Sequence, residues 1–373
     1  MFVESLKPEK IISFTKKEIV LTISAILAII SSFFNLPKLQ YIDFKVLIIL
    51  FNLMIIIAAF KSSKILDFLA LRILEKCNNY QKIAFTLVFI TFFSSMLITN
   101  DVALITFVPL TLILSKKIDK DPLKLIILQT ISANLGSSFT PLGNPQNLFL
   151  YNFYSYDVLN FLKVTFPVLA ASLVILAVMI LILPKTKVIF ITEEIEIKNR
   201  KQILYFCLLF ILVVLSVMNI IDYKITFALT LVSALLINKE YIKEVDYSLI
   251  LTFIFFFIFI GNLSSFNVIK DFMSSILNSY HSTFLSGIVL SQAISNVPCA
   301  MLLASFTSFS DALILGVNIG GLGTLIASMA SLISYKLYIQ EGERNQNYIK
   351  HFTLYNLVAL IILIVLVLGM KYL

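Results

Sequence analysis

The sequence predicts an all-α polytopic membrane protein with two inverted repeats, each holding a re-entrant hairpin and a broken transmembrane helix, joined by one extra helix. Three observations lead to this prediction. The 373 residues are 59% hydrophobic and only 13% charged. Apolar runs of about 20 residues, the length of helix that crosses a bilayer, recur along the chain. The order of these runs repeats, and two of them are interrupted by small polar residues.

The composition excludes a soluble domain and gives no sign of a metal or redox centre. The net charge is +8, which we assign to cytoplasmic loops rather than to nucleic-acid binding. Cys77, Cys207 and Cys299 match no metal or redox spacing. His281 and His351 lie far apart near predicted segment ends, so we expect no functional role for them. The basic leader precedes a long apolar run without an A-x-A pattern, so that run is expected to stay in the protein as a helix.

The first half of the chain holds six expected segments after its leader. Pro37 ends the first helix, and charged residues among Leu and Ile make the third segment amphipathic, as in a helix at the membrane surface. Polar residues interrupt the fourth and fifth segments. In order, the leader, two helices, interfacial stretch, interrupted segment, broken helix and long helix are expected at 1–17, 18–36, 44–60, 61–82, 83–114, 124–150 and 158–183.

The second half repeats this order after a charged loop and a connector helix at 203–221. Its six segments are expected at 225–237, 248–263, 266–280, 283–309, 312–338 and 352–370. The predicted organisation is therefore a first repeat in 1–183, a loop and connector in 184–224, and a second repeat in 225–373.

The two broken helices align without a gap. SANLGSSFTPLGNPQNL occupies 132–148 and GVNIGGLGTLIASMASL occupies 316–332. Irregular backbone at membrane depth persists only where protein or a watery cavity satisfies its polar groups. Paired breaks of this kind indicate the binding site of a transporter. The alignment places Asn134 on Asn318, Gly136 on Gly320, Thr140 on Thr324 and Leu148 on Leu332.

The distribution of Lys and Arg predicts the topology. If 83–114 and 283–309 are re-entrant hairpins, each repeat crosses four times and the connector inverts the second repeat. The cytoplasmic side then carries 23 of the 29 Lys and Arg residues. If the first hairpin crossed instead, the lysines of 116–124 would lie outside. We therefore expect a multi-pass protein of the bacterial inner membrane, with its N-terminus in the cytoplasm and its C-terminus outside.

Each hairpin tip carries a polar triplet, Thr99-Asn100-Asp101 in the first and Ser295-Asn296-Val297 in the second. Inversion would bring these tips to the broken helices near the middle of the membrane. Helix N-termini there favour an anion, and carbonyl, Asn and Thr oxygens can bind Na⁺. Glycines let the backbone approach a ligand closely, and we include Gly143 and Gly321 in the site.

Asp101 is the one acidic side chain placed deep within an apolar segment. A carboxylate there costs roughly 2.5–3.5 kcal/mol at a helix centre, so function is the default explanation. Asp101 is expected to be a Na⁺ ligand, together with Asn100, or a protonatable coupling group. The alternative is that it only caps the second hairpin arm. Val297 occupies the matching position, so cation chemistry should be asymmetric.

The other candidates have structural alternatives. Asn100 and Asn296 could only cap the tips, and Asn134 and Asn318 could serve helix–helix hydrogen bonding. Thr140 and Thr324 are favoured as ligands because each follows a Gly-rich break. Asn144 and Asn147 are ligands or loop residues, with neither favoured. A packing face is expected from Ala327, Ser328, Ser331 and Ser334.

Four motifs carry a family resemblance across nearly the whole chain: SMLITNDVALITFVPLTLIL, ANLGSSFTPLGNPQNLFLY, SQAISNVPCAMLL and GVNIGGLGTLIASMASLISYKLY. Together they resemble the ion transporter superfamily, which includes divalent anion:sodium symporters, arsenite permeases and sodium/proton antiporters. The small bacterial anion permeases are the most similar in appearance. The resemblance implies inverted repeats, two re-entrant hairpins, a homodimer and elevator-like alternating access.

The resemblance also implies site residues. Dicarboxylate symporters carry Ser-Asn-Thr at each tip, which corresponds here to Thr99 and Asn100 and to Ser295 and Asn296. Because Asp101 follows in place of Thr, the first tip is more similar to the arsenite permease and antiporter branches.

The expected function is secondary active transport of a small anion, a carboxylate or an inorganic oxyanion, coupled to Na⁺ or H⁺ without any other cofactor. Alternatives are Na⁺/H⁺ antiport through Asp101 and efflux of arsenite or antimonite. A passive channel is disfavoured because two inverted broken-helix units suit alternating access. An enzyme is not expected, since the sequence has no His-rich metal set and no nucleophile–base pair.

Overall fold

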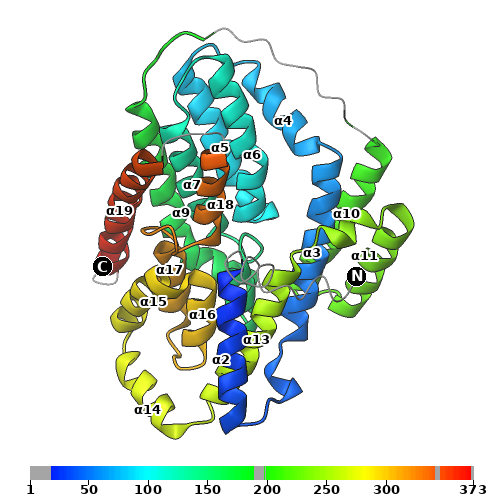
Figure 1. The fold of residues 1–373 in the computed structure, drawn as a ribbon, viewed down its shortest axis with the longest axis vertical. Coiled ribbons are helices and arrows are strands. Elements are labelled where there is room, and N and C mark those ends of the chain that lie inside the picture. Colours follow the sequence, from blue (N-terminus) through cyan, green and yellow to red (C-terminus); the bar gives the residue numbers. More distant parts are fainter. Residues whose placement is uncertain (1–17, 189–196, 198, 341–344, 371–373) are drawn as a thin grey trace, which may run out of the picture.

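The computed structural model describes residues 18–188, 197, 199–340 and 345–370 (Figure 1). Within these ranges the chain is helical, with one 3₁₀ turn and one isolated bridge between Asn79 and Lys187. The basic leader 1–17, Arg344, Lys371 and most of the charged loop before the connector lie outside the described residues.

The first repeat contains the expected segments. The stretch expected at the membrane surface contains α4, the interrupted segment is the pair α5 and α6, and the broken helix is the pair α7 and α8. The bounds are α2 Ile19–Phe34, η2 Leu39–Tyr41, α3 Phe44–Ser62, α4 Ile65–Leu74, α5 Tyr80–Ile98, α6 Asn100–Lys117, α7 Leu123–Ser137, α8 Pro145–Phe153 and α9 Val158–Leu181.

The connector is α10, and the second repeat follows in the same order. A short helix, α12, is the one addition that the sequence pattern did not predict. The bounds are α10 Arg200–Val217, α11 Tyr223–Ile237, α12 Glu240–Lys243, α13 Tyr247–Leu263, α14 Asn267–Ile276, α15 Tyr280–Ile294, α16 Asn296–Ala304, α17 Ser310–Gly320, α18 Met329–Gln340 and α19 Asn345–Met370.

Matching helices begin with matching caps. Asp43 and Asp246 cap α3 and α13, each accepting a hydrogen bond from the backbone N–H three residues later. Asn79 and Ser279 do the same for α5 and α15. These side chains satisfy N–H groups that the first turn of a helix leaves unpaired. The local sequence therefore sets the start of these four helices.

The helices pack as two bodies. We name α2, α3, α10, α11 and α13 the scaffold, in which α2 packs on α13 and α11 packs on α3. We name α5–α9 and α15–α19 the hairpin body, in which α5 packs on α7 and α15 on α17. The repeats also exchange partners, since α6 packs on α18 and α16 packs on α8. Reciprocal contacts of this kind are what a two-fold relation between two similar units produces.

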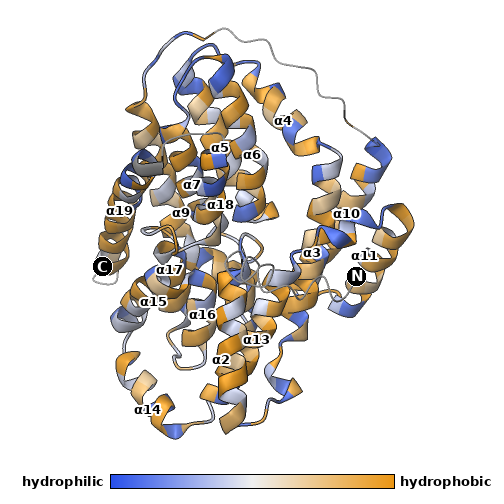
Figure 2. Ribbon diagram, in the orientation of Figure 1, coloured by the Kyte–Doolittle hydropathy of each residue, from blue (hydrophilic) through white to orange (hydrophobic). Residues whose placement is uncertain are grey.

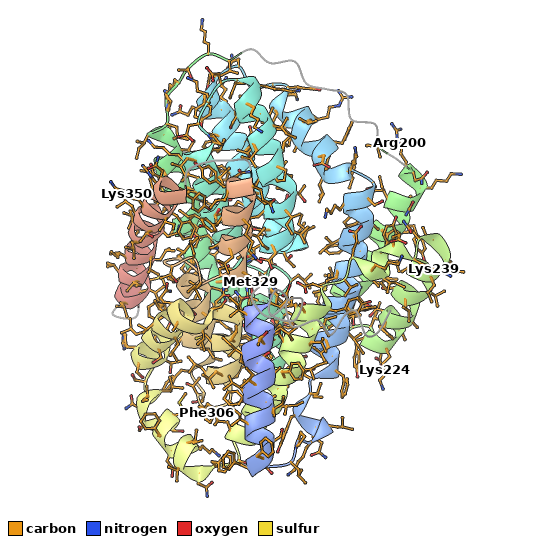
Figure 3. All side chains as sticks on the ribbon, viewed as in Figure 1. Arg200, Lys224, Lys239, Phe306, Met329 and Lys350 are labelled. Atoms are coloured by element: carbon orange, nitrogen blue, oxygen red, sulfur yellow. The ribbon has the colours of Figure 1, made fainter. Side chains whose placement is uncertain are left out.

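Figure 1 shows α5, α6 and α7 in the upper half and α15, α16 and α17 in the lower half. Met329, the first residue of α18, lies between the two halves (Figure 3). The helix breaks thus meet near the middle of the molecule. Two apolar clusters hold the arrangement together, one joining the scaffold to α8 and α16, the other filling the rest of the hairpin body.

The molecule has the surface of a membrane protein. Five described helices are long and apolar enough to cross a membrane, namely α3, α5, α9, α10 and residues 347–370 of α19, and α13 with α14 forms a sixth candidate bent by 101°. Many large apolar side chains on α2, α10, α11 and α19 are exposed, as a lipid-facing surface requires. In Figure 2 hydrophilic residues gather at the upper end, around the ends of α5, α6 and α7. The chain is therefore a multi-pass helical membrane protein.

Candidate functional site

The two hairpin tips share one unusual backbone conformation. Thr99 lies between α5 and α6 with φ 71° and ψ 153°, and Ser295 lies between α15 and α16 with φ 72° and ψ 153°. This region of torsion space is occupied almost only by glycine and is found at functional sites. Both tips reverse the chain in a single residue, so the arms α6 and α16 begin next to the breaks of α7–α8 and α17–α18.

Each tip is attached to the break of its own repeat. The backbone N–H of Asn100 donates to the carbonyl of Gly143 at 3.1 Å, and that of Asn296 donates to the carbonyl of Ala327 at 2.9 Å. Gly143 and Ala327 are equivalent in the alignment of the two broken helices. The same bond therefore fixes both hairpins.

Asn134 and Asn318 connect the two repeats. The Oδ1 atom of Asn134 accepts from Asn100 Nδ2 at 3.2 Å and from Ser328 Oγ at 2.9 Å. The Oδ1 atom of Asn318 accepts from Asn144 Nδ2 at 3.0 Å. Because Ser328 aligns with Asn144, the contacts Asn134–Ser328 and Asn318–Asn144 are repeat-related. Both asparagines are buried, so the expected helix–helix hydrogen bonds are present.

Asn144 and Asn147 lie inside this junction. Asn144 caps α8 by accepting from the Asn147 N–H at 2.8 Å. The Asn147 Oδ1 atom accepts from Asn318 Nδ2 at 2.6 Å. The Asn147 amide also donates to the carbonyls of Ser137, Ser138 and Thr140, which satisfies the irregular backbone of the break.

Two glycines of the predicted site meet neighbours that a side chain would displace. A Cβ on Gly143 would lie 2.1 Å from the Ser137 carbonyl oxygen, and a Cβ on Gly321 would lie 2.9 Å from Asn296 Nδ2. Gly143 therefore lets one side of the break fold against the other, and Gly321 lets the second tip approach its break.

Thr140 and Thr324 hold the hairpins from outside the junction. The Thr140 hydroxyl donates to the Met96 carbonyl, and the Thr324 hydroxyl donates to the Gln292 carbonyl at 3.3 Å. Met96 and Gln292 both lie three residues before a tip. Thr324 is also exposed. A ligand role for these two threonines stays a prediction.

Asp101 is the second residue of α6. The Oδ1 atom is buried and has no hydrogen-bond partner among the described residues. Asp101 and Thr99 line a cavity of about 190 Å³ whose other wall comes from α3 and from the segment that precedes α13. In the second repeat the matching residue is the buried Val297.

A second cavity, of about 560 Å³, is the repeat-related counterpart of the first. It is lined by Asp43, where the first has Asp246, and by Phe149, where the first has Ile333. From the second hairpin it takes Met301 and Ser305 but not the tip. Only the first cavity reaches a tip.

The chemistry of the junction is amide, hydroxyl and backbone, with one carboxylate. The helices α6, α8, α16 and α18 begin there, and α5, α7, α15 and α17 end there. N-terminal N–H groups favour an anion, and C-terminal carbonyls favour a cation. None of the junction residues named above is basic, so any anion would have to be held by amides, hydroxyls and helix dipoles.

Sequence analysis alone did not identify three residues of the site. Ser328 and Ser331 were assigned to a packing face, but both donate to or accept from Asn134. Gln292 was not considered, yet its amide donates to the carbonyls of Gly320 and Leu322 at 2.7 and 3.0 Å. Ser328 could have been found, because the ungapped alignment places it on Asn144.

The comparisons agree with this architecture. The family model described as citrate transporter matches residues 9–310. An uncharacterized transporter of Methanocaldococcus jannaschii is 38% identical over 85% of this chain and 87% of its own length. The inner membrane protein YbiR of Escherichia coli is 27% identical over 79% and 80%. The mouse P protein is 27% identical over a shorter stretch, 30% of this chain and 13% of its own length. The chain therefore belongs to the citrate transporter family, within the ion transporter superfamily, and is a membrane transporter.

Proposed function

We propose that this protein is a secondary active transporter that moves a small anion, a carboxylate or an inorganic oxyanion, together with Na⁺ or H⁺. The observation that carries the proposal is the position of Asp101, whose buried and unpartnered Oδ1 lies beside the helix N-termini of the junction. A carboxylate in this position needs a cation or a proton. The N-termini of α6, α8, α16 and α18 supply the complementary attraction for an anion.

The division into two bodies supports elevator-like alternating access. Both hairpins and both broken helices belong to the hairpin body, so the junction can move as a unit relative to the scaffold. The reciprocal contacts support inverted repeats, and the charge distribution supports a cytoplasmic N-terminus and an outer C-terminus. A homodimer and a location in the bacterial inner membrane complete the proposal, which rests for these points on the family resemblance.

Uptake into proteoliposomes under an imposed Na⁺ or H⁺ gradient tests the proposal. The panel contains labelled citrate, other carboxylates, inorganic oxyanions and arsenite. We expect accumulation of an anion that collapses when the gradient is removed. In Asp101→Asn, which keeps the size of the side chain, we expect gradient-driven accumulation to be lost, because an amide neither carries the charge that attracts a cation nor exchanges a proton near neutral pH. Unchanged Na⁺ and pH dependence in this variant would leave Asp101 with a capping role only.

A second candidate, Na⁺/H⁺ antiport, is favoured by the same unpartnered carboxylate oxygen. Antiport requires no anion, so Na⁺-driven proton movement in vesicles without any added anion would identify it. A pH-sensitive dye trapped in the vesicles measures this directly.

A further inference from the structure

The cavity beside the first tip is bounded by both bodies. The hairpin body contributes Thr99 and Asp101, and the scaffold contributes Lys61, Glu244 and Asp246. Three carboxylates and one ammonium thus line a space of about 190 Å³ between parts of the protein that belong to different bodies. Apolar side chains of α3 make up half of the remaining lining residues.

Asp101 and Asp246 both line this space. The charge of Asp246 acts on Asp101 unfavourably, as expected for two carboxylates at one cavity. Asp246 uses one oxygen to cap α13, accepting from the Leu249 N–H at 2.9 Å. An ionised carboxylate has a second accepting oxygen, which can bind a further partner.

Asp101 supplies the independent sign that a ligand belongs here. Its Oδ1 atom is buried and lacks any hydrogen-bond partner among the described residues, and the residue lines the cavity. A buried carboxylate oxygen without a donor is costly unless a cation or proton satisfies it. Glu244 adds negative charge to the cavity wall, and Lys61, Glu244 and Asp246 are all exposed.

We propose that Asp101 and Asp246 bind one Na⁺ ion together, across the gap between the hairpin body and the scaffold. Carboxylate oxygens with water complete the hard oxygen shell that such a cation prefers. The inference rests on the proposed function, in which the two bodies move against each other. It adds that the cation site is complete only when Asp101 lies opposite Asp246, so the ion stabilises this arrangement of the bodies.

The chain contains a matched control for this site. Asp43 is the repeat counterpart of Asp246 and caps α3 in the same way, with its Oδ1 atom 3.1 Å from the Val46 nitrogen. Its second oxygen already accepts from the Asn152 side-chain amide. The second cavity has no carboxylate from its hairpin, because Val297 replaces Asp101. Removing the charge of Asp43 should therefore leave Na⁺ binding unaffected.

Equilibrium binding of radioactive Na⁺ to the purified full-length protein, without any anion, tests the proposal. We expect saturable binding to the wild type and a Kd raised by at least about tenfold in Asp101→Asn and in Asp246→Asn, since each removes one of two ligand charges. Asp43→Asn should remain within about twofold of the wild type, because it removes no ligand. Asn retains the capping oxygen in both scaffold variants.

Wild-type affinity in Asp246→Asn, or no saturable binding to the wild type, would overturn the proposal. An elution profile and a Tm for each variant establish folding, and Asp246→Ser provides a second capping-competent variant if Asp246→Asn does not fold. Anion uptake by the same preparation separates the two levels of inference. Proton-driven anion uptake by a protein that does not bind Na⁺ would contradict this Na⁺ site but would still support the proposed transport function.

Discussion

Thr99 and Ser295 have the same backbone torsion angles, and the N–H that follows each one bonds to an equivalent carbonyl in its break. The side chains two residues after Thr99 and Ser295 differ in kind. The first tip continues with Asp101, which lines a cavity, and the second with Val297, which is buried. The comparison teaches that both repeats have the same backbone at the tip, but that only the first tip carries a carboxylate.

The contacts between the hairpin body and the scaffold also differ between the two repeats. The second hairpin arm α16 packs against α13, but the described residues of α6 and α3 make no comparable contact. The cavity on the α3 side reaches the tip, and the cavity on the α13 side reaches only Met301 and Ser305. In the proposed mechanism this is a state open toward the side of Lys61, which the charge count assigns to the cytoplasm.

The largest difference in stability that we predict lies between Gly136→Ala and Gly320→Ala. A Cβ on Gly136 would lie 2.2 Å from the Phe92 carbonyl oxygen, whereas a Cβ on Gly320 would lie 2.9 Å from Ser291 Oγ and 3.0 Å from the Gly287 carbonyl oxygen. Overpacking costs typically about 1–3 kcal/mol, and we place Gly136→Ala at about 3 and Gly320→Ala at about 1. Thermal unfolding in detergent should show a clearly lower Tm for Gly136→Ala.

Equal Tm losses in the two alanine variants would mean that α5–α7 and α15–α17 adapt equally. The α5–α7 contact would then be no tighter than the α15–α17 contact, and the two repeats would not differ in this respect. Gly369→Ala serves as the control, because a Cβ there would meet nothing within 4 Å.

Much of the fold follows from the sequence because its signals are local. Runs of apolar residues, the caps at Asp43 and Asp246, and the polar residues around Thr99 and Ser295 are enough to place the helices and breaks. The short helix α12 was missed, since four residues carry no periodic pattern. The direction of the Thr140 and Thr324 hydroxyls could not be predicted, because the backbone path through each break decides it.

The sequence predicts the site residues that lie in the aligned repeat motifs, but not those that lie outside them. Asn134, Asn318 and the two tips occupy matched positions in the alignment, and the structure shows Asn134 bonded to Asn100 at the first tip and Asn318 bonded to Asn144. Asp246 was not, because its approach to Asp101 depends on how the scaffold packs against the hairpin body. A local sequence pattern does not indicate how the scaffold packs against the hairpin body.

Asn144→Ser makes the first repeat resemble the second, where Ser328 occupies this position. Serine keeps the cap of α8 but loses the bond to Asn318 Oδ1, which accepts from no other donor among the described residues. A buried acceptor left unpaired costs about 1–3 kcal/mol. Ser328→Ala should cost less, about 1 kcal/mol, because Asn134 Oδ1 keeps its bond from Asn100. Tm values of the two variants check this order, and the reverse order would contradict it.

The smallest effects are expected for Thr140→Val and Thr324→Val, and they separate a structural role from the ligand role that the sequence favours. The partly buried Thr140 hydroxyl bonds to the Met96 carbonyl, so its loss should cost about 1 kcal/mol. The exposed Thr324 hydroxyl should cost less than about 0.5 kcal/mol. If both only hold the hairpins, the KM for the transported anion should stay unchanged, and Thr140→Ser should restore the Tm because it keeps the hydroxyl. A raised KM at an unchanged Tm would instead place a threonine hydroxyl on the substrate, and would require the break to rearrange when the substrate binds.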